Sequence, residues 1–258
     1  MNLGFIGTGT IAKAMIEGTL QVSAEEKKIF VSPRNAQIAN SLAEQFPQVK
    51  IAKDNQEIVE KSDVVFLCLR AQIAQEILSG LKFRPEQSLV SVVPTTTIKE
   101  LKLWANGTAD IYRAVPLPFV AKPSGMATPF YPANDFLNGF FQELGGAIVL
   151  TQEKELALFM VAGSMMGVYF HFLEGCRNWL ETQGIAPEQA RAYLSGLFYN
   201  LSCELAKSKD TNFCALEGEF STRGGTNEFL SKKFVEEGGI ESLKKAIEET
   251  YRCIYKNS

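Results

Sequence analysis

The first twelve residues constrain the fold of this 258-residue chain more than any other segment. An apolar run, Leu3–Ile6, leads into Gly7-Thr8-Gly9-Thr10-Ile11-Ala12, and a helix-like segment follows. In this G-x-G-x-x-A pattern the first glycine permits a tight turn, the second lets a pyrophosphate approach the backbone, and the alanine permits close packing of helix on strand. The helix N-terminus presents free amides to phosphates. The chain is therefore expected to begin with a dinucleotide-binding βαβ unit.

The first half of the chain continues this alternation of strands and helices. Several predicted strands lack polar alternation, which is typical of a parallel sheet covered on both faces. Repeated β–α units with right-handed crossovers predict a doubly wound, Rossmann-type α/β domain over residues 1–150. The further predicted strands are Ile29–Val31, Val49–Ile51, Val64–Leu69, Leu89–Val93, Asp110–Val115, Met126–Phe130 and Ala147–Leu150. The predicted helices are Thr10–Val22, Ala36–Phe46, Gln72–Leu81, Ile98–Ala105 and Asn134–Leu144.

The second part, residues 151–258, is predicted to be an all-helical domain. Helical segments are expected at Lys154–Gln183, Pro187–Ser208 and Gly239–Tyr255. The uncharged run Leu156–Leu173 reaches the lower length limit for crossing a bilayer. Two glycines, a serine and a histidine interrupt it, so we expect a helix buried inside the protein or a dimer rather than a membrane span.

Composition narrows the function classes. The formal net charge of −3 argues against nucleic acid as a partner. Five cysteines without C-x-x-C spacing and a single histidine predict no zinc cluster and no other metal site. The cysteines fit free thiols in a reducing compartment, and the N-terminus lacks the basic segment of a signal peptide. A cytoplasmic location is therefore expected.

The end of the second strand predicts which dinucleotide binds. An NAD site usually carries an acidic residue there for the ribose 2′-hydroxyl. This chain reads Val31-Ser32-Pro33-Arg34-Asn35 and has no acid. Ser32, Arg34 and Asn35 can instead donate to a 2′-phosphate, so NADP(H) is predicted in preference to NAD(H). The alternative is that Arg34 is only a solvated residue at a helix start.

Three blocks of sequence resemble the pyrroline-5-carboxylate reductase family, and the resemblance covers almost the full length. They are the opening GFIGTGTIAKAMIEG; Asp54-Asn55 followed by SDVVFLCLRAQ; and EFSTRGGTNEFLSKKFVEEGGIESLKKAIEET near the C-terminus. The resemblance implies NADPH-dependent reduction of 1-pyrroline-5-carboxylate to L-proline by a homodimer that in some members builds larger rings. It also implies cofactor contacts at Asn55, Leu69 and Arg70, with Arg70 replacing the usual lysine.

The substrate site is predicted from two separated segments. Phosphates held at residues 7–12 would bring the nicotinamide near Val93 and Pro94. The glycine-rich segment Ser221-Thr222-Arg223-Gly224-Gly225-Thr226-Asn227 opens a helix and offers amides and hydroxyls to a small carboxylate. The family usually reads S-P-G-G-x-T there. Arg223 replaces its proline, and Asn227 replaces a threonine thought to lie near the imine nitrogen, so Thr226 and Asn227 are the catalytic candidates.

Departures from the family keep alternatives open. Leu117, Pro118 and Ala162 replace polar family positions, which makes the expected pocket more apolar. The chain could therefore reduce a different cyclic imino acid, or bind NADP without catalysis. Arg223 could clamp the substrate carboxylate or face solvent. A β-hydroxyacid dehydrogenase is disfavoured because no lysine lies between Glu155 and Ala206.

Overall fold

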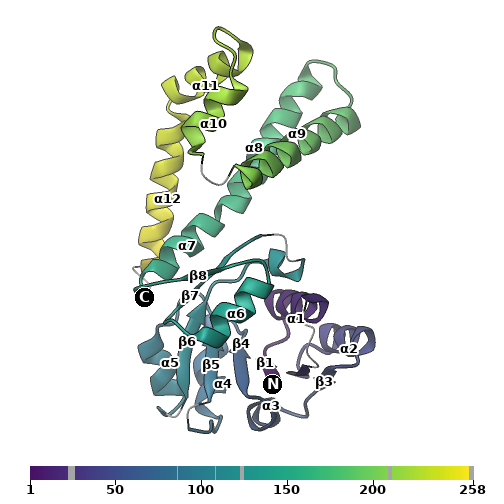
Figure 1. Cartoon of the computed structure of the whole chain (residues 1–258), viewed down its shortest axis with the longest axis vertical. Coiled ribbons are helices and arrows are strands. Elements are labelled where there is room, and N and C mark those ends of the chain that lie inside the picture. Colours follow the sequence, from purple (N-terminus) through teal and green to yellow (C-terminus); the bar gives the residue numbers. More distant parts are fainter. Residues whose placement is uncertain (23–26, 86, 108, 123–124, 209–210, 256–258) are drawn as a thin grey trace. The chain divides into compact units, whose positions relative to one another are not determined.

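The computed structural model describes residues 1–22, 27–85, 87–107, 109–122, 125–208 and 211–255 (Figure 1). Contacts divide the chain into two compact units. The first contains Met1–Met160 together with the C-terminal residues from Tyr251, and the second contains Val161–Thr250. Residues 209–210 and 256–258 of the predicted helical domain lie outside the described residues.

The first unit is built on an eight-stranded sheet with the order β3-β2-β1-β4-β5-β6-β7-β8. Strands β1 to β6 pair in parallel, β7 is antiparallel to β6, and β8 is parallel to β7. This topology confirms the predicted doubly wound sheet. The strands are β1 (Asn2–Ile6), β2 (Lys28–Val31), β3 (Val49–Ile51), β4 (Val64–Leu67), β5 (Ser88–Ser91), β6 (Asp110–Ala114), β7 (Thr128–Tyr131) and β8 (Ala147–Val149).

Helices follow the strands of this unit, and local caps explain where several begin. The side chains of Asn35, Asp54, Thr97 and Asn134 each accept an N–H bond from the first turn of the following helix. The helices are α1 (Thr10–Val22), α2 (Ala36–Gln45), α3 (Asn55–Lys61), α4 (Ala71–Ser79), α5 (Ile98–Trp104) and α6 (Asp135–Glu143), with a 3₁₀ turn η1 (Pro118–Ala121).

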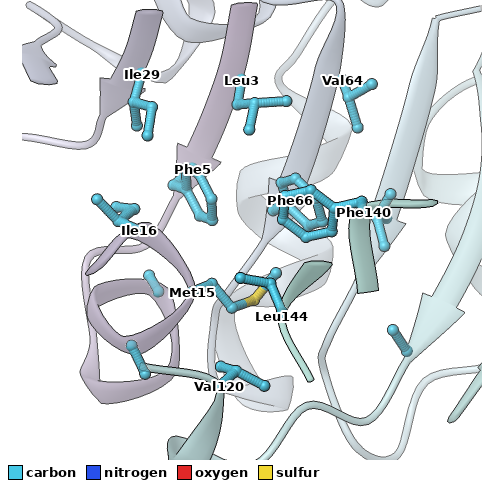
Figure 2. Packing of buried hydrophobic residues seen from close by; sticks show 14 of the residues in the cluster. Leu3, Phe5, Met15, Ile16, Ile29, Val64, Phe66, Val120, Phe140 and Leu144 are labelled. Atoms are coloured by element: carbon cyan, nitrogen blue, oxygen red, sulfur yellow. The ribbon is translucent and has the colours of Figure 1, made fainter. Parts of the chain in front are cut away.

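Alternation along the strands fills both faces of the sheet with apolar side chains. Leu3 and Phe5 of β1 pack in one buried cluster with Phe66 of β4, whose ring stacks on Phe5 at 4.9 Å between centroids (Figure 2). Their neighbours Ile6 and Leu67 belong to a second cluster. Because successive side chains point to opposite faces, a sheet covered on both sides requires uninterrupted apolar runs.

The second unit is helical. Its elements follow α7 (Glu155–Gly163) and are α8 (Met165–Thr182), α9 (Pro187–Lys207), α10 (Phe213–Phe220) and α11 (Thr226–Glu236), with α12 (Gly239–Tyr255) returning to the first unit. The helical segment predicted over Lys154–Gln183 is confirmed as α7 and α8, with a one-residue interruption at Ser164 that was not predicted. The Ser164 N–H bonds to the Val161 carbonyl, three residues back, and Gly163 beside it weakens the helix.

Helix α8 is not buried within the chain. None of its residues is buried, and several of its large apolar side chains are exposed. The expectation that the chain's own fold covers this helix is therefore wrong, whereas burial in a dimer stays a prediction. By length and composition alone, the segment Glu155–Thr182 could cross a membrane: its most apolar 18-residue window has a mean hydropathy of 1.7, and 11% of that window is buried.

Candidate active site

The glycine turn after β1 has the geometry that a phosphate-binding turn requires. Gly7 has φ of 96°, and a Cβ there would lie 2.4 Å from the Cys68 carbonyl oxygen. Around Gly9, in contrast, a Cβ would meet no atom within 4 Å. The Lys13 N–H bonds to the Gly9 carbonyl at 2.9 Å, so the earlier amides of the first turn of α1 have no partner one turn back. A ligand can therefore approach the backbone at Gly9.

The end of β2 braces this turn. The buried Ser32 hydroxyl accepts from the Gly7 N–H at 2.9 Å and donates to Asn55 Oδ1 at 2.7 Å. The Thr8 hydroxyl donates to the Ser32 carbonyl at 2.8 Å, and Asn35 Nδ2 donates to the Thr8 carbonyl at 3.0 Å. Ser32 and Asn35 thus hold the phosphate turn in place through hydrogen bonds within the protein, before any nucleotide binds.

Arg34 differs from the other two predicted 2′-phosphate donors. Its side chain is exposed, and among the described residues it makes no hydrogen bond or ion pair. A guanidinium in this position can bind a phosphate bidentately without breaking an existing contact.

A cavity of about 560 Å³ lies where β1, β4 and β5 end, at the edge where the strand order reverses. Ligands of open α/β sheets bind at this topological switch point, and the volume suits a small-molecule site. It brings together the predicted residues Gly9, Thr10, Ile11, Ala12, Leu69, Arg70 and Pro94. Five lining residues were not predicted: Cys68, Ala71, Gln72, Val92 and Thr95. Because residues after neighbouring parallel strands meet at one edge, extending each predicted segment by one or two residues would have found them.

Other predicted cofactor residues lie outside the lining of this cavity. Val93 is buried in the core, and Gly7 and Thr8 form hydrogen bonds to Ser32 instead of lining the cavity. Ser32, Arg34, Asn35 and Asn55 belong to the neighbouring strand ends, β2 and β3.

The electrostatics of the cavity favour an anion. The first turns of two helices line it: α1 through Thr10, and α4 through Ala71. Helix N-termini carry partial positive charge. Arg70 adds a cation, no Asp or Glu belongs to the described lining, and burial raises the pKa of the Cys68 thiol, which keeps it neutral. The residues therefore fit a pyrophosphate.

The segment 221–227 forms a tight turn in the second unit. The Gly225 N–H bonds to the Thr222 carbonyl at 2.8 Å, and Gly224 has φ of 75°. Asn227 Nδ2 donates to the Phe220 carbonyl at 2.7 Å, which ties the turn to the end of α10. Thr226 begins α11. The amide of Asn227 therefore has a structural role, and Thr226 keeps an exposed hydroxyl.

Glu228 is a site residue that sequence reasoning missed. Its carboxylate accepts the Gly224 N–H at 2.5 Å, so an internal anion occupies one amide of the predicted carboxylate receptor. The Lys232 ammonium, followed by the Gly224 amide, lowers the pKa of Glu228. Glu228 and Lys232 line a cavity of about 310 Å³ together with Arg223 and Ser221. An acid three residues after the N-cap Gly225 is the spacing of a capping box, which could have revealed this contact.

Comparisons with known proteins agree with this geometry. Residues 2–95 match the family described as "NADP oxidoreductase coenzyme F420-dependent". Pyrroline-5-carboxylate reductase 2 of Bacillus subtilis is 23% identical over 96% of this chain and 92% of its own length. The structure of a Coxiella burnetii pyrroline-5-carboxylate reductase has a TM-score of 0.87 at 20% identity, covering 100% of this chain and 98% of its own. That of a Plasmodium falciparum pyrroline carboxylate reductase with NADP bound has a TM-score of 0.81 at 15% identity, covering 100% and 98%.

The matches to pyrroline-5-carboxylate reductases extend through both units, whereas the family model ends at residue 95. Among the described residues, no cluster of three or more His, Cys, Asp or Glu side chains could hold a metal ion. The chain is therefore similar to pyrroline-5-carboxylate reductases in sequence, and it shares their fold.

Proposed function

We propose that the protein reduces a cyclic imine with NADPH, and that the imine is 1-pyrroline-5-carboxylate, which becomes L-proline. The observation that carries the proposal is the cavity at the switch point, where the phosphate turn, two helix N-termini and the Pro94 turn converge. The relatives of similar length that carry the name pyrroline-5-carboxylate reductase support the choice of imine.

The cofactor half of the site follows from the contacts of the first unit. NADPH, when bound, supplies the hydride. In our proposal residues 9–12 hold its pyrophosphate, Arg34 holds its 2′-phosphate, and Val92, Pro94 and Thr95 form the wall beside the nicotinamide. The wall must be fixed, because hydride transfer requires the donor and acceptor carbons to be held in contact at the correct angle.

The substrate half belongs to the 221–227 turn. Arg223 is exposed beside the turn and can bind the substrate carboxylate bidentately. Hydride adds to the imine carbon, and protonation of the neighbouring nitrogen makes that carbon electrophilic enough to accept it. We assign Thr226, rather than Asn227, as the hydroxyl that hydrogen-bonds that nitrogen, because the Asn227 amide already bonds to Phe220. No side-chain nucleophile is required.

The proposal includes a homodimer. Helix α8 leaves several large apolar side chains exposed, and clusters of such side chains on a surface often mark an interaction site. A second copy of the helical unit would cover them, as the family resemblance implies. The five cysteines form no disulfide, which supports work in the reducing cytoplasm.

A panel of imines tests the proposed function. The purified protein is mixed with NADPH and either 1-pyrroline-5-carboxylate, its six-membered-ring homologue or 1-pyrroline, and NADPH oxidation is followed at 340 nm. We expect turnover of the five-membered imino acid, and much slower turnover with NADH. Preference for the six-membered ring would assign a different imino acid. Tight NADPH binding without oxidation in any mixture would reject the enzyme in favour of a non-catalytic cofactor-binding protein.

A further inference from the structure

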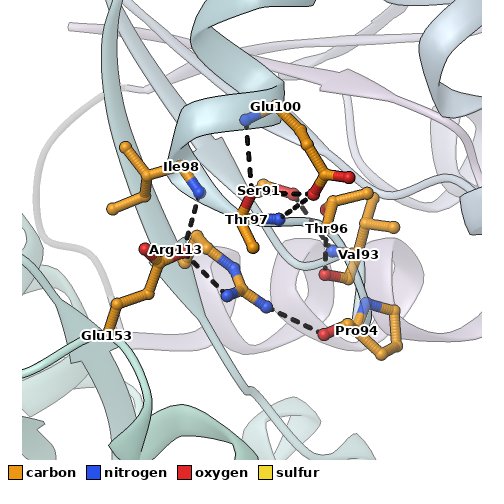
Figure 3. A network of polar contacts seen from close by, with 9 residues as sticks. All are labelled: Ser91, Val93, Pro94, Thr96, Thr97, Ile98, Glu100, Arg113 and Glu153. Carbon is orange, nitrogen blue, oxygen red and sulfur yellow. Dashed lines mark hydrogen bonds and ion pairs between the residues drawn. The ribbon is translucent and has the colours of Figure 1, made fainter. Parts of the chain in front are cut away.

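One buried arginine ties together four segments around the cofactor cavity. Arg113 on β6 is 8% exposed. Its guanidinium bonds to Glu153 Oε1 at 2.9 Å and to the Pro94 carbonyl at 2.8 Å (Figure 3). The same Glu153 oxygen accepts the Ile98 N–H at 2.7 Å. The pair therefore joins the end of β5, the start of α5, strand β6 and the turn before α7.

Within the turn that Arg113 holds, Pro94 itself has little other support. Pro94 and Thr95 line the 560 Å³ cavity and also a second cavity of about 410 Å³, which Arg113 and Glu153 themselves line. Pro94 is exposed between the buried residues Val93 and Thr96, so packing anchors the flanks of the turn more than Pro94 itself. Pro94 has no N–H, so its carbonyl is its one backbone hydrogen-bonding group, and Arg113 binds it.

The bonds on either side of Pro94 are local and weaker. Ser91 Oγ accepts the Val93 N–H at 3.2 Å, and the Thr96 hydroxyl reaches the Val93 carbonyl at 3.4 Å. A charge-assisted bond from a paired, desolvated guanidinium is stronger than either. The position of the cavity wall formed by β5 therefore depends on Arg113 more than on the residues of the turn.

We propose that Arg113 is a positioning residue, which fixes the Pro94 turn as the wall beside the nicotinamide through its pairing with Glu153. The inference rests on the proposed function, because it assigns the nicotinamide to that wall. Arg113 itself does not contact the reacting atoms. A wall displaced by about 1 Å would misplace the hydride donor and lower kcat by roughly 10- to 100-fold.

The test compares Arg113→Met, which cannot donate, with the conservative Arg113→Lys and with Glu153→Gln. Arg84→Met is the matched control: Arg84 also donates to backbone carbonyls, those of Val59, Glu60 and Ser62, but it lines neither cavity. Each variant is titrated with NADPH and with adenosine 2′,5′-bisphosphate, which keeps the 2′-phosphate and one of the two pyrophosphate phosphates but lacks the nicotinamide. Turnover of the preferred imine is measured in parallel.

We expect Arg113→Met to weaken NADPH binding or lower kcat by about 10-fold or more while the affinity for the bisphosphate changes less than about twofold. Arg113→Lys should lose less than Arg113→Met. Arg84→Met should bind both ligands with wild-type affinity. An equal loss for both ligands, or a wild-type kcat and NADPH affinity in Arg113→Met, would overturn the inference. If Arg113→Met does not fold, Arg113→Lys and Glu153→Gln carry the same comparison.

The two proposals can fail separately. A wild-type protein that reduces no imine removes the proposed function, while the NADPH-against-bisphosphate difference still decides whether Arg113 positions the nicotinamide wall. A wild-type protein that reduces an imine, combined with unchanged Arg113 variants, removes only the positioning role.

Discussion

At the scale of single residues, three side chains at the end of β2 divide two tasks. Ser32 and Asn35 hold the phosphate turn through hydrogen bonds to Gly7 and Thr8. Arg34 carries an exposed charge with no partner among the described residues. The preference for the 2′-phosphate should therefore reside in Arg34 alone.

Replacing Arg34 with Ala should raise KM for NADPH by about 10-fold or more, because a hydrogen bond to a charged group contributes roughly 1.5–3 kcal/mol. KM for NADH should stay within about twofold, since NADH has no 2′-phosphate for the side chain to bind. Lys28→Ala, which removes an exposed cation from the opposite end of β2, is the control. Equal increases for both cofactors would show that Arg34 does not recognise the 2′-phosphate.

Arg223 can be tested with a pair of substrates. If it clamps the carboxylate, Arg223→Ala should raise KM for 1-pyrroline-5-carboxylate about 10-fold. The same change should leave KM for 1-pyrroline, which lacks the carboxylate, within about twofold. Steady-state kinetics with both imines measure the difference directly. An unchanged KM for the imino acid would show that Arg223 faces solvent and does not bind the carboxylate.

At the scale of elements, most of the first unit could be predicted because its signals are local. Strands such as β1 and β4 are apolar on both faces, and helices such as α5 begin at a cap that the sequence displays, Thr97 with Glu100. The one-residue interruption between α7 and α8 was not predicted, because the Gly163-Ser164 pair lies inside an otherwise apolar run. The η1 turn was missed because its position depends on α1, a distant segment.

That contact between α1 and η1 yields a stability prediction. A Cβ on Gly18 would lie 1.9 Å from the Val120 carbonyl oxygen, so Gly18→Ala should lower the free energy of unfolding by about 1–3 kcal/mol despite the better helix propensity of alanine. Gly139→Ala in α6 is the matched control, since a Cβ there meets nothing within 4 Å. It should stabilise the protein by up to about 1 kcal/mol. Urea denaturation of both variants measures these changes in the free energy of unfolding. A stabilised Gly18→Ala would contradict the close packing of α1 on Val120.

At the scale of the whole molecule, sequence reasoning reaches a limit at the second unit. Several large apolar side chains of its helices are exposed in the single chain, and the proposal that a second copy covers them goes beyond what one sequence specifies. The same limit applies to the substrate site. The Arg113–Glu153 pair escaped prediction for a related reason, because it joins segments far apart in the chain and no residue pattern in either segment specifies it.

The apolar face of α8 permits a direct test of the dimer. Phe170 is 67% exposed among other exposed apolar residues, whereas Leu103 on α5 is 76% exposed in the first unit. Light scattering after size exclusion, without detergent, should give the wild type a molar mass of twice 28.5 kDa or a larger multiple. Phe170→Asp should lower that mass, because burying an unpaired carboxylate in an apolar interface is unfavourable. Leu103→Asp should leave the mass unchanged. A wild type that runs as a monomer, or that stays in solution only with detergent, would show that no second copy covers α8.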